Sequence, residues 1–93
     1  MQLDAAYELD PQVSLRPEPF GALAYHFGTR RLSFLRSHDI VAVVEALDHA
    51  DNVEAALRDA GIDERRWPSF ENALTTLEAS DMIRARSAAG VVA

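Results

Sequence analysis

The spacing of apolar residues changes once along the chain, and this change constrains the fold more than any other feature. Between residues 13 and 36 apolar side chains recur at every second position, which is the period of a β-strand. From Ser37 onward they recur at intervals of three and four, which is the period of an amphipathic helix. Strands followed by helices predict an α+β fold, with an N-terminal three-stranded antiparallel sheet followed by a three-helix bundle.

Three short strands are expected in the first part of the chain. The first, residues 13–16, ends where two prolines interrupt the alternation. The second covers residues 22–27 and leads into a turn at Gly28-Thr29, after which the third covers residues 31–35. In a meander the third strand pairs only with the second, so its outer edge is expected to stay open.

Alternation also divides the side chains of each strand between two faces. The second strand places Leu23, Tyr25 and Phe27 on one face, with Ala22, Ala24 and His26 on the other. The third strand places Leu32 and Phe34 on one face, with Arg31 and Ser33 on the other.

Three helices are expected in the rest of the chain. The first begins at Ser37, a favourable N-cap residue, and the second ends at Gly61. The third begins near Pro68, which suits a first helical turn. Two helices joined through Gly61 suggest a winged helix-turn-helix-like arrangement. Residues 82–86 fit either a last strand or an extension of the third helix.

The ends of the chain differ in composition from its middle. Residues 1–12 are polar and acidic and are expected to form a flexible arm, whereas residues 87–93 are expected to form a tail. One domain is therefore expected over residues 13–86. No signal peptide and no apolar run long enough to cross a bilayer is visible, so a cytoplasmic protein is expected.

The residue types that usually carry catalysis or hold a cofactor are scarce or scattered. The chain has no Cys, which excludes disulfides, thiolate nucleophiles and Cys-based metal sites. His26, His38 and His49 lack the spacing that places two metal ligands on one helical face, and Ser33 and Ser37 have no evident base. We expect a protein that is not an enzyme and holds no metal or cofactor. A small metal-dependent enzyme is an alternative that bound metal would reveal.

Charge is distributed unevenly along this acidic chain. The net charge is −6, but residues 14–36 carry four arginines against one glutamate. A winged helix-turn-helix protein would insert its third helix into DNA, yet the chain has no Lys or Arg between Trp67 and Ile83. Phosphates would repel the carboxylates of this helix, so nucleic-acid binding is not expected. An acidic winged-helix regulator or a protein–protein adaptor stays the alternative.

The segment from Leu15 to Leu35, LRPEPFGALAYHFGTRRLSFL, closely resembles the mycofactocin biosynthesis chaperones, which are precursor-recognition elements similar to the pyrroloquinoline-quinone chaperone. The similarity extends in layout over residues 13–83 and is most specific over residues 15–47. It implies a non-catalytic adaptor that binds the leader of a ribosomally made precursor peptide and presents it to a radical S-adenosylmethionine maturase. It also implies that residues 13–86 form a peptide-recognition domain.

In this family the peptide lies antiparallel to the third strand, in a groove between that strand and the third helix. The resemblance implies peptide contacts from one strand with its flanking arginines and from one helix: Arg30, Arg31, Leu32, Ser33, Phe34, Leu35, Phe70, Ala73, Leu74, Leu77 and Glu78. From the residues alone, packing in the core is favoured for the apolar helix residues, with groove lining for only some of them. The arginines, Arg36 included, either guard the open strand against self-pairing or favour an acidic leader.

Overall fold

The computed structural model of the protein describes residues 1–86, so the tail expected over residues 87–93 lies outside the described residues. Strands and helices follow one another in an α+β order, as the apolar spacing predicts. In chain order they are β1 (Tyr7–Leu9), β2 (Val13–Glu18), β3 (Gly21–His26), β4 (Leu32–Leu35), α1 (His38–Leu47), α2 (Val53–Asp59), the short 3₁₀ helix η1 (Glu64–Arg66), α3 (Trp67–Ala79) and β5 (Ile83–Ala85).

The antiparallel meander of β2, β3 and β4 confirms the three-stranded sheet expected from the alternating segment. At Gly21 the backbone φ is 149°, and a Cβ there would lie 2.1 Å from the Leu35 carbonyl oxygen. Only glycine therefore lets the chain enter β3 this close to the end of β4. As expected, β4 pairs with β3 alone among the described strands, and its other edge is open.

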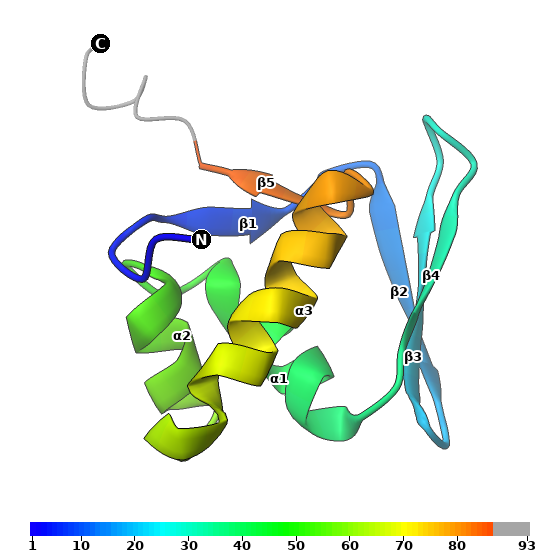
Figure 1. Ribbon diagram of the computed structural model, residues 1–93. Helices are drawn as coiled ribbons and strands as arrows, with labels where there is room; N and C mark the ends of the chain where they lie inside the picture. Colours follow the sequence, from blue (N-terminus) through cyan, green and yellow to red (C-terminus); the bar gives the residue numbers. More distant parts are fainter. Residues whose placement is uncertain (87–93) are drawn as a thin grey trace, which may run out of the picture.

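The expectation of one N-terminal sheet was wrong, because the described chain forms a second sheet. In it, β1 and β5 pair antiparallel, with Tyr7 opposite Ala85 and Leu9 opposite Ile83. Part of the segment expected to be a flexible arm is therefore a strand, and residues 83–85 form a strand that does not extend α3. Figure 1 shows this small sheet at the end of the molecule where the first and last described segments meet.

Local sequence signals set the ends of the helices. The Ser37 hydroxyl accepts the Ile40 N–H at 3.2 Å, which confirms the expected N-cap of α1. Gly61 follows α2 with a φ of 74°, as a helix-terminating glycine does, and Pro68 lies in the first turn of α3. The likeness of these helices to a winged helix-turn-helix stays a prediction.

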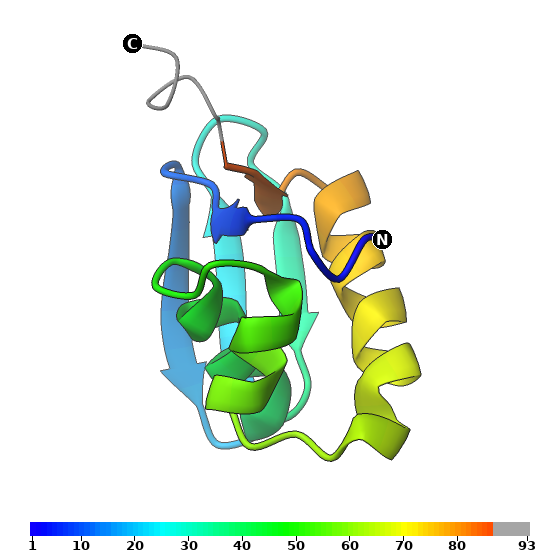
Figure 2. The ribbon, with the colours of Figure 1, turned by 90° about the vertical axis from the view of Figure 1, so that its left-hand side faces the viewer.

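The hydrophobic core lies between the helices and one face of the three-stranded sheet. Ala22 and Ala24 of β3 are almost completely buried there, and so are Val43 and Val44 of α1. Small side chains on β3 let α1 approach the sheet closely. Figure 2 shows α1 and α2 in front of the sheet, while α3 lies beyond the edge strand β4.

Candidate functional site

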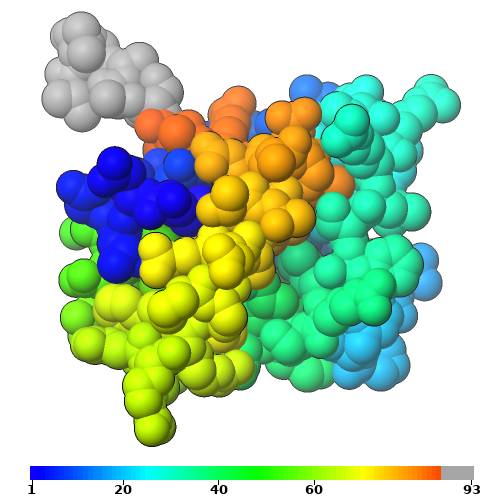
Figure 3. All heavy atoms as spheres, viewed as in Figure 1, coloured from blue at the N-terminus to red at the C-terminus, as the bar shows by residue number. Residues whose placement is uncertain are grey.

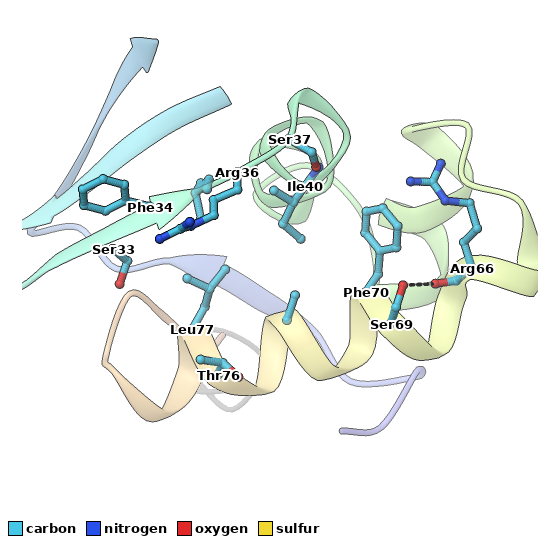
Figure 4. A pocket seen from close by; sticks show the side chains of 12 residues that line it. Ser33, Phe34, Arg36, Ser37, Ile40, Arg66, Ser69, Phe70, Thr76 and Leu77 are labelled. Atoms are coloured by element: carbon cyan, nitrogen blue, oxygen red, sulfur yellow. Dashed lines mark hydrogen bonds between the residues drawn. The ribbon is translucent and has the colours of Figure 1, made fainter. Parts of the chain in front are cut away.

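A groove with a volume of about 640 Å³ lies between β4 and α3. Ile40 of α1 and Phe70, Ala73 and Leu77 of α3 give it an apolar wall. In Figure 3 the residues of α3, yellow to orange, border the green residues of β4 and early α1 on one face of the molecule. Figure 4 shows the Ile40, Phe70 and Leu77 side chains extending into the space beside the strand.

The open edge of β4 supplies unpaired backbone groups to this groove. Antiparallel ladders alternate between residue pairs that exchange hydrogen bonds and pairs that do not. The His26 N–H donates to the Arg31 carbonyl at 3.0 Å, so the register of β3 and β4 directs the backbone groups of Ser33 and Leu35 toward β3. It follows that Leu32 and Phe34 direct their N–H and C=O groups toward the open edge.

Six of the eleven residues expected to contact a peptide line this groove. They are Ser33, Phe34 and Leu35 of β4 and Phe70, Ala73 and Leu77 of α3. Leu74 does not line it, because its side chain is completely buried in the core. The Glu78 carboxylate also lies elsewhere, where it accepts a hydrogen bond of 3.2 Å from the Tyr7 hydroxyl.

The remaining three expected residues stand at the far end of β4 or on its edge. Arg30 lies in the turn that precedes the strand, with a φ of 63° and its N–H bonded to the His26 carbonyl at 2.7 Å. Arg31 follows it in the same turn, and the Leu32 side chain is exposed. The structure therefore places the side chains of these residues outside the lining of the groove.

Arg36 and Arg66 both line the groove, and each is held against an aromatic ring. The Arg36 guanidinium carbon lies 5.6 Å from the centre of the Phe34 ring, and that of Arg66 lies 5.0 Å from the centre of the Phe70 ring. Arg66 also contacts the Asp39 carboxylate at 3.0 Å. Figure 4 shows the two guanidinium groups toward opposite ends of the groove.

Sequence reasoning missed Arg66 as a groove residue, although a signal for it was present. It stands four residues before Phe70, and this spacing places two side chains on the same side of a helix.

Among residues 1–86, no group of three or more His, Asp and Glu side chains is arranged to hold a metal ion. Each ring nitrogen of His26 and the Nε2 of His38 has a different neighbour. His26 Nδ1 accepts the N–H groups of Gly28 and Thr29, both at 3.0 Å, and His38 Nε2 lies 2.9 Å from the Pro19 carbonyl oxygen. In the same part of the chain, no helix is long and apolar enough to cross a membrane.

Comparison with known proteins places the chain among relatives of one kind. The family model described as the peptide chaperone MftB family matches residues 6–84. The chain is 48% identical over 80 residues to the peptide chaperone MftB of Mycobacterium tuberculosis (strain ATCC 25618 / H37Rv), covering 86% of this chain and 73% of that protein. With the peptide chaperone MftB of Mycobacterium ulcerans (strain Agy99) it shares 51% identity over 81 residues, covering 86% and 73% of the two chains. With that of Mycolicibacterium smegmatis (strain ATCC 700084 / mc(2)155) it shares 47% over 81 residues, covering 86% and 78%. No solved structure matches the chain.

Proposed function

The chain belongs to the peptide chaperone MftB family, whose role lies in mycofactocin biosynthesis, and we propose that its groove holds the leader of a ribosomally made precursor peptide. The leader pairs with the open edge of β4, and the chaperone presents the rest of the peptide to a radical S-adenosylmethionine maturase. The chaperone itself carries out no chemical step.

One observation carries this proposal: the unpaired edge of β4 and the apolar wall of α3 face the same groove. An extended peptide that joins a sheet edge gains main-chain hydrogen bonds, and neighbouring pockets select its side chains. Leu32 and Phe34 offer the N–H and C=O groups for such pairing. An added strand would lie about 4.8 Å from β4, on the side where α3 stands.

The lining of the groove predicts the kind of leader that fits. Apolar side chains of the leader enter the space beside Ile40, Phe70 and Leu77, where their burial is favourable by roughly 25 cal/mol per Å² of apolar surface. The two guanidinium groups of Arg36 and Arg66 favour carboxylates in the leader on either side of this apolar segment. A leader with one or two apolar anchors flanked by Asp or Glu is therefore the expected ligand.

Holding the leader benefits a reaction that takes place elsewhere. Linking two binding events makes the second one intramolecular, at an effective concentration in the millimolar range for a short flexible linker. The core of the precursor is then kept near the maturase while the leader stays on β4.

The direct test is calorimetric titration of the chain with the leader of the precursor peptide from the same organism. Ala73→Tyr should fill the groove and weaken binding at least tenfold, because Ala73 lines it from α3. Thr75→Tyr is the matched control, since Thr75 is exposed on the same helix and does not line the groove. Equal affinity of both variants and the parent would contradict binding in this groove.

A scrambled leader of the same composition controls for binding through charge alone. It should bind at least tenfold more weakly than the natural leader, because its apolar side chains no longer alternate in step with the strand. If the protein binds a DNA duplex and does not bind the leader, the alternative of an acidic winged-helix regulator would be favoured instead.

A further inference from the structure

The face of the three-stranded sheet that is turned away from the helices is apolar and rich in rings. Phe27 is 62% exposed, Leu32 56% and Phe34 55%, which is far more than core residues of their size. We call this surface the aromatic face; its large side chains are Phe20, Leu23, Tyr25, Phe27, Leu32 and Phe34. Exposed apolar patches of this kind on soluble domains usually mark interaction surfaces.

The side chains of the aromatic face form one continuous surface. The rings of Phe20 and Phe34 are stacked with their centres 5.9 Å apart, and Phe34 lies opposite Leu23 across β3 and β4. Tyr25 follows Leu23 on the same side of β3, and its ring packs edge to face with the Phe27 ring, with the two centres 5.1 Å apart. The aromatic face therefore extends along the length of β3, from the turn between β2 and β3 to the turn between β3 and β4.

The helices leave this surface uncovered. The opposite side chains of β3, those of Ala22, Ala24 and His26, are buried toward the helices. Figure 1 shows the three-stranded sheet at the margin of the molecule, with α1, α2 and α3 all on one side of it. Within residues 1–86, no helix or strand packs on the aromatic face.

The margin of the aromatic face is basic on an otherwise acidic chain. Arg16 lies opposite Leu23 on this face, and the Arg36 guanidinium carbon lies 5.6 Å from the centre of the Phe34 ring. Glu18, bonded to Arg16 at 2.8 Å, is the only acidic residue among residues 14–36. Two copies pressed together through this face would bring like charges close, and the net charge of −6 opposes an anionic membrane. A protein surface with an apolar centre and carboxylates at its margin fits best.

We propose that the aromatic face binds the enzyme that receives the peptide, and that the enzyme contributes a surface with an apolar centre and carboxylates at its margin. This inference depends on the proposed function and extends it. A leader added to the edge of β4 would continue the sheet, and every second side chain of the leader would join the aromatic face. The enzyme would then contact chaperone and leader together, so leader and enzyme each raise the affinity of the chaperone for the other by the same factor.

The experiment measures the affinity of the purified maturase of the same organism for the chain, with and without saturating leader. The variant Tyr25→Thr/Phe27→Ser removes two rings from β3 and the following residue, away from the open edge of β4. It should weaken maturase binding at least tenfold and change leader affinity less than twofold. Leader should strengthen maturase binding to the parent severalfold.

A second pair of variants tests the charge of the margin without removing rings. Arg16→Glu should weaken maturase binding severalfold, whereas Arg65→Glu, an exposed arginine outside the sheet, should leave it unchanged. If the melting temperature of Tyr25→Thr/Phe27→Ser is too low for its binding to be informative, the two arginine variants test the inference in its place. Equal maturase affinity of Arg16→Glu, Arg65→Glu and the parent overturns the inference.

The remaining outcomes separate the two proposals. Maturase binding that persists in the folded double variant overturns this inference and leaves leader binding intact. A parent that fails to bind the leader overturns the proposed function instead. The parent could also form a dimer or bind phosphatidylserine vesicles. If the double variant loses either property but still binds the maturase, the aromatic face serves a second copy or a membrane, and the docking of the enzyme is overturned.

Discussion

The Tyr7 hydroxyl donates a hydrogen bond of 3.2 Å to the Glu78 carboxylate, and this bond joins β1 to α3 across most of the sequence. Tyr7 is buried, and burial together with the neighbouring Glu78 carboxylate raises its pKa above the ordinary value of 10.0. This bond therefore connects the first strand to the helix that forms one wall of the groove.

Replacing Tyr7 by Phe should destabilise the fold, by an amount that depends on pH. At pH 8 the phenol is protonated in both states, and the lost hydrogen bond should cost about 0.5–1.5 kcal/mol. Above about pH 10 the unfolded chain releases this proton while the folded chain keeps it, so the stability of the parent falls as pH rises. Tyr7→Phe lacks this loss, so the free energies of unfolding of the two proteins should converge at high pH.

Urea unfolding at pH 8, 9, 10 and 11 measures this difference, with Tyr25→Phe on the aromatic face as the control. A gap between parent and Tyr7→Phe that stays constant from pH 8 to pH 11 would contradict the role given to the phenol.

Apolar spacing and end signals predicted most of the fold, because they act over a few neighbouring residues. The helix beginning at Ser37 and the meander of β2 to β4 both follow from such local patterns. The pairing of β1 with β5 did not, since Tyr7 and Ala85 are far apart in sequence and each strand has three residues. Nothing in so short a segment distinguishes a strand from an arm until its partner is known.

Local patterns also could not predict which face of the sheet packs against the helices. Alternation divided Ala22 and Ala24 from Leu23 and Tyr25, but it does not state which face meets the helices. Size alone would place the larger apolar side chains inside. In the structure the two alanines face α1, because small side chains permit close approach of the helix, and the rings remain outside. In the groove, likewise, only the assembled fold separates lining Leu77 from buried Leu74.

His26→Ala should destabilise the turn that leads into β4. Its Nδ1 accepts two backbone N–H groups, those of Gly28 and Thr29, so the ring proton resides on Nε2, 3.7 Å from the Asp10 carboxylate. Removing the ring leaves both donors without their protein acceptor; because Gly28 and Thr29 are exposed, water can replace it, and the loss should be about 0.5–1.5 kcal/mol. Urea unfolding measures the loss, and His49→Ala, at an exposed position, is the control. Equal stability of the two variants would show that the ring does not hold this turn.

Proline substitutions along β4 should separate folding from binding. Ser33→Pro removes an N–H that faces Ala24 in β3, so it should lower the stability of the fold by about 1–3 kcal/mol. Phe34→Pro removes an N–H that faces the open edge, where proline is tolerated. It should stay folded but bind the leader about tenfold (about 1.4 kcal/mol) more weakly than Phe34→Ala, which has lost the same ring.

Melting temperature and leader affinity, measured on all three variants, test the direction assigned to each N–H. Leader affinity that is equal in Phe34→Pro and Phe34→Ala, with both folded, would rule out pairing at this residue.

Arg36→Glu should weaken leader binding more than Arg31→Glu, because Arg36 lines the groove and Arg31 stands in the turn before β4. Exposed ion pairs contribute about 0.2–1 kcal/mol each, so reversing the charge of Arg36 should cost severalfold in affinity while the apolar anchors retain the rest. The screening length falls from about 10 Å at 0.1 M salt to about 3 Å at 1 M. High salt should therefore lower the affinity of the parent for the leader and reduce the difference in affinity between the parent and Arg36→Glu. Calorimetry at both salt concentrations, with the parent and the two variants, measures these effects. If affinity is independent of salt and Arg36→Glu binds like the parent, the arginines only protect the strand edge from self-pairing, and apolar contacts with Ile40, Phe70 and Leu77 alone select the leader.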